Sequence, residues 1–413
     1  MSLSVENSRE IHRLKRRTKR LFKFNINKVT KLEPSGNRRK GSKCPEPRSG
    51  HRIVVYNGNV YAFGGFNPSI HDDDTDGEQH QVLFKELWRF NFAAKNWTRL
   101  ETTGTMPDQL ASHAAALVNN CMIVYGGTGV PFGESSSNST HVCNLDKLEW
   151  QTLPTTGYLP LEQYGQAITV HDGKMYAIGG TTGYTYSMTA HCLNLITREW
   201  TLIGSDKIED LHHDPAPRYR HEIAVYDNQI FVFGGGTASE TYGFKEIPVL
   251  NLTTNTWRYC ASSDVYPPAR KCHGCVQRGS DVFICGGLDG SQIFSDVWKI
   301  NLKSLQWEKL KTQLPTPVYF HSTALSPAGQ IIIFGGVSDL TQNVRSNELY
   351  SVWIKIPPLA EMCWQAILTY IPNIALLERQ KLVKTGIPIQ YINQIEFSKS
   401  SEIENKNCCK LLS

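Results

Sequence analysis

Short apolar runs that end in two glycines recur along the whole chain. The first ends at Gly64-Gly65 and the last at Gly335-Gly336, and the first glycines of the six pairs stand at positions 64, 126, 179, 234, 286 and 335. Self-similarity at a period of roughly 50 residues is typical of repeat architectures, in which each unit buries a face against its neighbours. A glycine pair suits the end of a buried strand, because a Cβ would crowd the backbone where it turns.

Each of the first five glycine pairs is followed by a tryptophan within a stretch of alternating polar and apolar residues: Trp97, Trp150, Trp200, Trp257 and Trp307. A turn and a histidine or similar residue precede each glycine run, as in Pro217-Arg218-Tyr219-Arg220-His221. This order predicts four strands per unit, with the glycine strand second and the tryptophan strand fourth. Six such units predict an all-β chain folded as a six-bladed β-propeller, and the period resembles that of kelch repeats.

The sixth unit lacks a fourth strand of its own. It contains three predicted strands (321–325, 331–334 and 347–353) and then reaches Pro357-Pro358. Residues 24–32 alternate in polarity and end in the same way as Trp97-Thr98-Arg99-Leu100. We therefore expect residues 24–32 to supply the outer strand of blade six, which removes an open sheet edge and extends the propeller over residues 24–355. The alternative is a three-stranded last blade and a floppy N-terminal tail.

Charge is concentrated in the head of the chain. Residues 1–43 contain 14 Lys or Arg and three Glu, although the whole chain has a net charge of only +5. We expect residues 1–23 to be a disordered basic tail; a nuclear-import signal or a nucleic-acid arm at residues 13–20 is the alternative. No basic–aromatic interleaving follows, so nucleic-acid binding is unlikely. Eleven scattered cysteines without a signal peptide or membrane span predict a cytoplasmic or nuclear protein.

No motif predicts catalysis, a metal or a cofactor. Residues 72–77 begin like a calcium loop, but Leu83 stands where the loop needs a glutamate, so we expect a solvated loop. The pair Cys272 and Cys275 has no second pair at zinc-site distance and predicts buried thiols. Phosphate-loop, nucleophile-elbow and zinc-protease motifs are missing from the sequence. A propeller enzyme remains an alternative that would require a metal in the purified protein.

The turns before the glycine strands and the loops after them are expected to rim one mouth of the channel. We expect seven of their residues to bind a ligand: Arg218, Tyr219, Arg220, Arg270, Tyr164, Tyr184 and Tyr319. The same segments also carry Lys271, Phe132, Tyr186 and Phe320. Aromatic and guanidinium groups together suit a chain end with a free carboxylate, which Arg binds with two hydrogen bonds. The alternative is that repeated arginines brace neighbouring blades.

The composition changes after Pro358. Residues 356–397 contain three predicted helices, at 359–368, 374–383 and 389–395, and residues 398–413 are expected to be disordered. Such short helices cannot form a large core, so they either pack on the propeller or dock on a partner. The fold expected overall is a six-bladed propeller followed by a short α-helical box.

This tail carries a resemblance to a known family. The pattern Leu359-x-x-x-Cys363-x-x-x-Ile367 resembles the elongin C-binding box of ubiquitin-ligase substrate receptors, and Ile371, Pro372 and Leu376 resemble the cullin 2-binding segment that follows it. Residues 132–135, 181–184 and 218–222 strengthen the likeness to the kelch-domain receptors of this group. The resemblance covers about residues 48–390.

The resemblance implies a non-catalytic substrate-recognition subunit of a cullin 2–RING ubiquitin ligase. Its partners would be elongin B, elongin C, cullin 2, a RING subunit and substrate proteins whose C-terminal degrons end in small residues. Related receptors hold the terminal carboxylate with arginines just after a glycine pair, where this chain has Thr237 and Asp289. The alternative is a kelch scaffold that regulates a signalling kinase or phosphatase. In that case the tail would pack on its own ring and bury Leu359 and Cys363.

Overall fold

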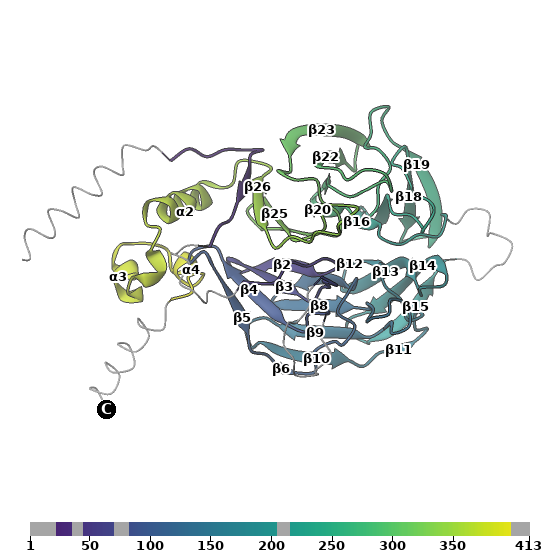
Figure 1. Cartoon of the computed structure of the whole chain (residues 1–413), viewed down its shortest axis with the longest axis horizontal. Coiled ribbons are helices and arrows are strands. Elements are labelled where there is room, and N and C mark those ends of the chain that lie inside the picture. Colours follow the sequence, from purple (N-terminus) through teal and green to yellow (C-terminus); the bar gives the residue numbers. More distant parts are fainter. Residues whose placement is uncertain (1–21, 35–43, 70–81, 205–214, 398–413) are drawn as a thin grey trace, which may run out of the picture.

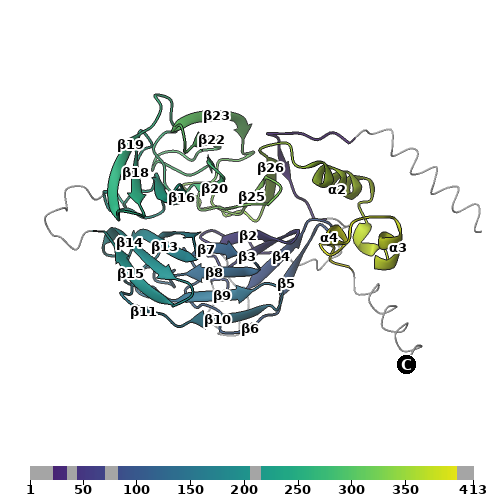
Figure 2. The same cartoon turned by 180° about the vertical axis from the view of Figure 1, so that it is seen from behind.

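The computed structural model describes residues 22–34, 44–69, 82–204 and 215–397. Residues 13–20, residues 72–77 and both tail ends, 1–21 and 398–413, for which the sequence made predictions, lie outside the described residues. The strands form six sheets around a central axis, with a small helical unit beside them (Figure 1; Figure 2). The predicted six-bladed β-propeller is therefore confirmed.

Each blade is an antiparallel sheet whose first strand lines the channel. Blade one contains β2 (Arg52–Tyr56), β3 (Asn59–Phe63), β4 (Leu87–Asn91) and β5 (Asn96–Leu100). Blade two contains β7 (Ala114–Val118), β8 (Cys121–Tyr125), β9 (Thr140–Asn144) and β10 (Glu149–Leu153). Blade three contains β12 (Ala167–His171), β13 (Lys174–Thr181), β14 (Tyr186–Asn194) and β15 (Glu199–Ile203).

The other three blades continue the ring. Blade four contains β16 (Glu222–Tyr226), β17 (Gln229–Phe233), β18 (Glu246–Asn251) and β19 (Thr256–Ala261). Blade five contains β20 (Gly274–Arg278), β21 (Asp281–Cys285), β22 (Asp296–Asn301) and β23 (Gln306–Gln313). Blade six contains β24 (Ser322–Leu325), β25 (Gln330–Phe334) and β26 (Leu349–Trp353). The inner strands contact one another in chain order, and β24 contacts β2, so the ring is closed.

Two short strands brace neighbouring blades. β6 (Thr103–Gly104) and β11 (Thr156–Gly157) come from the linkers after blades one and two, and they pair in parallel with β10 and β15 of the following blade. A Cβ on Gly104, at φ +80°, would lie 1.9 Å from the carbonyl oxygen of Trp150. Glycine is therefore required where this linker crosses the neighbouring strand.

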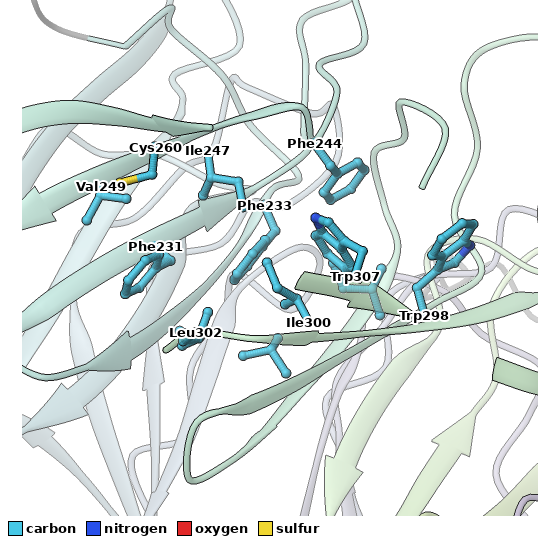
Figure 3. Close-up of a cluster of buried hydrophobic side chains, with 13 residues drawn as sticks. Phe231, Phe233, Phe244, Ile247, Val249, Cys260, Trp298, Ile300, Leu302 and Trp307 are labelled. Atoms are coloured by element: carbon cyan, nitrogen blue, oxygen red, sulfur yellow. The ribbon is translucent and has the colours of Figure 1, made fainter. Parts of the chain in front are cut away.

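The blades are held together by aromatic contacts that explain the repeat. The tryptophan of one blade packs on the residue before the glycine pair of the preceding blade; ring centroids are 4.7 Å apart for Phe63 and Trp150, and 5.3 Å apart for Tyr125 and Trp200. Figure 3 shows the equivalent boundary between blades four and five, where Phe233 and Trp307 meet. Such pairs bury large apolar areas between sheets that could not cover their own faces.

The segment at 24–32 lies on the outside of blade six. It contributes the short strand β1 (Val29–Lys31), which pairs antiparallel with β26. Val29 lies opposite Val352, in the position that the tryptophan occupies in the other blades, and belongs to the apolar cluster between blades five and six. Backbone bonds from the nitrogens of Asn27 and Leu32 to the carbonyl oxygens of Trp353 and Leu349 extend the pairing.

The tail forms a compact helical unit with its own small core. It contains α2 (Leu359–Tyr370), a 3₁₀ turn (Ile374–Leu376), α3 (Arg379–Lys384) and α4 (Ile389–Ile392). The helix expected at 374–383 is interrupted, because Leu377 is extended, at φ −84° and ψ 149°. Ile374 and Leu382, on either side of this break, both lie in the same apolar cluster as Trp364.

The helical unit is fixed to the propeller at the end of the blades opposite the glycine pairs. Ala93, in the turn between β4 and β5, joins the apolar cluster of the helices. Asn91 Nδ2 donates a hydrogen bond of 2.7 Å to the carbonyl oxygen of Gln394, and Arg89 forms an ion pair with Glu396. The unit therefore has a defined orientation relative to the channel.

Candidate functional site

The mouth of the channel lies at the opposite end from the helices. We use the term mouth for the surface that is formed by the six turns before the inner strands and by the loops that follow the glycine pairs. In each turn one residue has a positive φ, between 55° and 68°, and its N–H bonds to the carbonyl oxygen of the equivalent residue in another blade. These residues form a closed ring of six hydrogen bonds: Gly50, Ser112, Gly165, Arg220, Cys272 and Phe320.

The channel is nearly filled just inside this ring. Arg52 of blade one and Glu222 of blade four form an ion pair across the channel, with 3.0 Å between Nη1 and Oε1. The space that remains beside them measures about 20 Å³, which is room for roughly one water molecule. A polypeptide end that enters the mouth therefore stops at the ring instead of passing through the channel.

Aromatic side chains line the mouth as an arc. The ring centroids of Phe66 and Phe132 are 4.9 Å apart, those of Phe132 and Tyr164 are 6.4 Å apart, and those of Tyr164 and Tyr219 are 6.5 Å apart. Tyr186 continues the arc, 5.2 Å from Tyr219. Burial raises the pKa of Tyr164 and Tyr219, so their hydroxyl groups stay protonated and can donate hydrogen bonds.

Arg220 lies at the floor of the mouth. Its guanidinium group donates to the hydroxyl of Ser112 in blade two and stacks over Phe320 of blade six, with Cζ 4.5 Å from the ring centroid. The rings of Tyr219 and Tyr164 lie 5.6 Å and 6.0 Å away. Arg220 forms no ion pair with any of the described residues. An uncompensated guanidinium with aromatic walls is suited to hold a carboxylate with two hydrogen bonds.

Sequence analysis missed a second arginine at the mouth. The guanidinium of Arg345 lies 5.2 Å from the centroid of Phe66, and its Nε donates a hydrogen bond of 3.1 Å to the hydroxyl of Ser49. Arg345 lies far from the glycine pair, in the longest loop of blade six. The repeat pattern does not extend into this loop, so it does not predict where Arg345 lies. Lys271 adds a third cation, although its Nζ donates to the carbonyl oxygen of Thr237 at 2.6 Å.

The structure does not bring Arg218 and Arg270 to the mouth with Arg220. Both are buried, with 4% and 0% of their surface exposed, and each donates from Nη1 to the carbonyl oxygen of a first glycine, Gly234 or Gly286. Arg270 also forms an ion pair with Asp296, at 2.7 Å. The first residue of each of these turns, Arg218 or Arg270, therefore points into its own blade, where it braces the glycine strand. The expected role of the two arginines in ligand binding stays a prediction.

The expected tyrosines divide between the mouth and its margin. Tyr164 and Tyr219 belong to the aromatic arc described above. Tyr319 is 7% exposed and packs beside Phe320, with 5.1 Å between ring centroids. Tyr184 is 82% exposed in the loop between β13 and β14, so it is available only to a ligand that extends beyond the floor.

The histidines of the repeat are structural. His51, His113, His221, His273 and His321 are buried between blades, and Gln166 takes their place in blade three. Burial lowers the pKa of His113 and His221 to about 3 and that of His321 to about 4, so these rings are neutral near pH 7. Burial also raises the pKa of Cys272 to about 12, which keeps this thiol protonated.

The first two residues of the box pattern on α2 point away from the helical core, and the third lies at its edge. Leu359 is 74% exposed and Cys363 is exposed, whereas Trp364 and Leu368 on the other face are buried. Ile367 and Ile371 are partly buried against the helical core, Pro372 is half-buried and Leu376 is exposed. The alternative in which the tail buries Leu359 and Cys363 against its own ring does not match this packing.

In the parts of the chain that the structure describes, no group of three or more His, Cys, Asp or Glu side chains is arranged to hold a metal ion. None of the helices described has the length and apolar character needed to cross a membrane.

Six glycine-paired blades and an aromatic, cationic mouth define a kelch-repeat β-propeller, a class that consists in general of non-catalytic scaffolds for protein interaction. The chain belongs to the kelch-repeat family described as the KLHDC2/KLHL20/DRC7 Kelch-repeats domain, which matches residues 12–180 and 181–372. It is 43% identical over 362 residues to Kelch domain-containing protein 10 of Homo sapiens, covering 86% of this chain and 81% of that protein.

More distant relatives share the same extent. The Kelch domain-containing protein 10 homolog of Drosophila melanogaster is 39% identical over 387 residues, covering 85% of this chain and 62% of that protein. Kelch domain-containing protein 2 of Bos taurus is 24% identical over 366 residues, covering 80% of this chain and 87% of that protein. The similarity therefore spans the propeller as a whole and is not confined to single repeats.

Proposed function

We propose that this protein is a substrate-recognition subunit of a cullin 2–RING ubiquitin ligase. The mouth binds the C-terminus of a substrate protein, and α2 binds elongin C through Leu359, Cys363 and Ile367. Ile371, Pro372 and Leu376 contribute to the cullin 2 contact, and elongin B and a RING subunit complete the assembly. The observation that carries this proposal is the exposure of Leu359 and Cys363 on α2, in a helical unit fixed to the propeller.

Leu359 is exposed although the rest of its helix is well ordered. Leu359 heads a helix whose other face is well packed, so its exposure is not the result of poor folding. Cys363 lies one turn further along the same face, where a small side chain lets another helix approach closely. Four more aliphatic residues are exposed on the other elements of the helical unit: Leu376, Leu377, Val383 and Ile389.

The mouth supports the substrate half of the proposal. Arg220, Arg345 and the protonated tyrosine hydroxyls provide donors for a terminal carboxylate, and the closed floor limits how far a chain end can enter. Degrons that end in Gly or Ala fit this geometry, because a small last residue lets the carboxylate reach the floor. Since the helices occupy the other end of the propeller, substrate and ligase would bind at the same time.

The proposal is tested by affinity purification of the full chain from cells, comparing wild type with Leu359→Ala/Cys363→Phe. The double variant is expected to lose elongin B, elongin C and cullin 2 and to keep the wild-type melting temperature, because both side chains are exposed. Ile196→Ala, which removes an 86% exposed side chain on blade three, is the matched control. Retention of elongin C by the double variant, or a wild-type preparation without elongins, would contradict the proposal.

A further inference from the structure

Blades one and five share a buried ion pair at the glycine end of the blade. Arg48 binds Glu86, with 2.6 Å between Nη2 and Oε1, and Arg270 binds Asp296 with two hydrogen bonds of 2.7 Å and 3.2 Å. Nη1 of each arginine also donates to the carbonyl oxygen of the first glycine of its blade, at 3.0 Å and 2.9 Å. Each guanidinium stacks on a phenylalanine, with Cζ 4.1 Å from the ring centroid in both blades.

Backbone pairing locates the equivalent positions in all six blades. The arginine position is the residue whose carbonyl oxygen accepts a hydrogen bond from the second glycine of the preceding blade: Arg48, Leu110, Gln163, Arg218, Arg270 and Val318. The acid position lies four residues before the residue that pairs with the repeat tryptophan, or with Val29 in blade six: Glu86, Ser139, Thr189, Glu246, Asp296 and Glu348.

Blade six has the acid without the arginine. Blades one, four and five have both residues, and blades two and three have neither. In blade six Glu348 stands at the acid position, and Val318 stands at the arginine position. Val318 is buried in the apolar cluster between blades five and six and cannot supply a charge to the acid.

Blade six also has a small residue in place of the stacked ring. In blades one and five the N–H groups of Phe84 and Phe294 bond to the carbonyl oxygen of the second glycine. The N–H group that makes this bond in blade six belongs to Ser346. Two short side chains, Val318 and Ser346, therefore stand where a guanidinium and an aromatic ring lie in blades one and five.

A pocket with a volume of about 310 Å³ lies at this place. It is lined by the residues that correspond to Arg270 itself and to the four groups that hold Arg270 in blade five: Val318, Thr316, Gly335, Ser346 and Glu348. No backbone N–H of the described residues donates to the carbonyl oxygen of Thr316 or Gly335. Thr316 is exposed, so the pocket opens to solvent.

The carboxylate of this pocket is ionised. Lys31 Nζ lies 2.7 Å from Oε1 of Glu348, and the hydroxyl of Tyr350 donates to Oε2. These two hydrogen bonds lower the pKa of Glu348, so the group is charged near pH 7. Each carboxylate oxygen can accept a further hydrogen bond.

Lys31 does not take the place of the arginine. In blades one and five the acid has a second cation, which comes from the fourth strand: Arg99 lies 3.3 Å from Glu86, and Lys309 lies 3.9 Å from Asp296. Lys31 belongs to β1, the fourth strand of blade six, and is the equivalent of these two residues. Blades one and five thus show that one carboxylate accommodates the fourth-strand cation and a guanidinium together.

Arg345 also lines the pocket, but other groups hold its guanidinium. Its Nε donates to the hydroxyl of Ser49, and its Nη1 donates to the carbonyl oxygen of Asn343 at 2.8 Å. Among the described residues it forms no ion pair with Glu348. Arg345 therefore places the pocket next to the mouth without filling it.

We propose that this pocket binds the guanidinium group of an arginine side chain on a protein partner. The incoming group is held by Glu348 and by the carbonyl oxygen of Gly335. Blades one and five are the reason to name arginine, because the same acid and the same glycine carbonyl bind a guanidinium twice within this protein. A planar guanidinium can donate to both groups at once, which the point charge of a lysine does less well.

The first experiment uses a probe whose only charge is a guanidinium, N-acetyl-arginine amide, with N-acetyl-citrulline amide as the neutral isostere. Ligand-observed NMR titrations compare the full-chain wild type with Glu348→Gln and with Glu199→Gln, which removes an exposed acid of blade three. Wild type and Glu199→Gln are expected to bind the arginine probe about tenfold more tightly than the citrulline probe. Glu348→Gln is expected to lose this preference. A wild type without the preference, or a preference that survives in Glu348→Gln, would overturn the proposal.

A second pair of variants leaves Glu348 in place. Val318→Arg supplies an internal guanidinium at a position where blades one and five already hold one, and Val318→Met is its neutral match. The arginine variant is expected to lose the preference for the arginine probe and to melt at or above the temperature of the methionine variant. The methionine variant is expected to keep the preference. Equal probe binding by the two would overturn the proposal even if Glu348→Gln fails to fold.

The basic residues of the adjacent chain segment are tested in the same way. Arg38, Arg39, Lys40 and Lys43 lie between Lys31 and Cys44 in sequence and outside the described residues. The titrations are repeated with all four changed to Gln. A preference for the arginine probe in both backgrounds supports a partner arginine. A preference that emerges only after the four changes would show that the chain fills its own pocket and would overturn the proposal.

Peptides extend the inference to substrates, and this step rests on the proposed function. An arginine is moved stepwise along short peptides that end in Gly with a free carboxylate, and each peptide is compared with its citrulline twin. At one position the arginine peptide is expected to bind wild type about tenfold more tightly than its twin, but not Val318→Arg. Equal binding of all twins would overturn the extension to substrates. If no peptide binds wild type, the substrate proposal for the mouth fails, while the pocket is still decided by the small probe.

Discussion

Arg220 has a backbone conformation that suits a glycine, and its long side chain lies at the floor of the mouth. Its φ is +58°, and glycine occupies two of the six equivalent positions in the ring, at 50 and 165. A non-glycine residue in this left-handed region costs about 1–2 kcal/mol. No ion pair with the described residues offsets this cost, although stacking over Phe320 recovers part of it.

Replacing Arg220 with glycine should therefore separate binding from stability. For Arg220→Gly we expect an unfolding free energy within about 1 kcal/mol of wild type, because relief of backbone strain offsets the lost stacking. Affinity for a peptide that ends in a free carboxylate should fall roughly 30-fold or more, since the carboxylate loses its main partner. Urea unfolding and fluorescence polarisation measure the two quantities.

An amidated peptide provides the control for this variant, because it should bind wild type as weakly as the acid binds Arg220→Gly. Wild-type affinity in Arg220→Gly would exclude Arg220 as the carboxylate-binding residue and leave Arg345 as the candidate. A large fall in stability would instead show that the guanidinium holds the ring together.

The residue types at the mouth could be predicted from the sequence, but their directions could not. Arg218, Arg220 and Arg270 lie in equivalent turns and look alike in the repeat. Their side chains diverge because the third residue of the turn is left-handed and faces the axis, whereas the first is followed by extended backbone and enters its own blade. The direction of each arginine side chain depends on the sign of φ at one residue of the turn. The alternation of polar and apolar residues in the sequence does not indicate that sign.

At the scale of elements, the blades are predictable because their strands carry alternating polarity and end in fixed glycines. The second tail helix is less predictable: its apolar spacing fits one helix, but the chain is extended at Leu377, and Ile374 and Leu382 on either side are both buried in one small core. Tertiary packing overrides the local pattern there. The histidines at the repeat position each belong to a different blade and are buried between blades.

These histidines should make the propeller sensitive to acid. A buried histidine whose pKa is about 3 in the folded protein takes up its proton only on unfolding. The unfolded chain binds that proton below a pH of about 6.5, so stability is complete above that pH and falls as the pH is lowered toward 3. Each such histidine contributes a slope of about 1.4 kcal/mol per pH unit in this window.

Blade three shows how to test this slope. Gln166 occupies the histidine position there, and its Nε2 donates a hydrogen bond of 2.9 Å to the carbonyl oxygen of Tyr125. His221→Gln should therefore fold, and its unfolding free energy between pH 6.5 and pH 4 should decrease less steeply than that of wild type, by the slope of one histidine. Urea unfolding across this range measures the difference, and Gln166→His should steepen it. Equal slopes in all three proteins would show that the buried rings do not control acid stability.

At the scale of the whole molecule, ring closure joins the beginning of the chain to its last blade. The outer strand of blade six comes from residues that are more than 300 positions away in sequence, with Val29 opposite Val352. Phe24 contacts Trp353, and the backbone nitrogen of Phe22 donates to the hydroxyl of Tyr370 in α2. The same segment therefore closes the propeller and touches the helical unit proposed to bind elongin C.

Removing this strand should destabilise the ring, and the chain offers a matched pair of truncations. A chain without residues 1–33 loses β1 and exposes the edge of β26, whereas a chain without residues 1–21 keeps β1 and Phe22. The strand contributes several backbone hydrogen bonds of about 1 kcal/mol each and the burial of Val29. We expect the longer truncation to melt about 5–10 °C below wild type and to self-associate through the open edge, and the shorter one to match wild type.

Val29→Asp in the full chain should reproduce the loss of stability without removing Phe22 or Phe24. Wild-type melting of both the longer truncation and Val29→Asp would show that β1 is dispensable and that three strands suffice for the last blade.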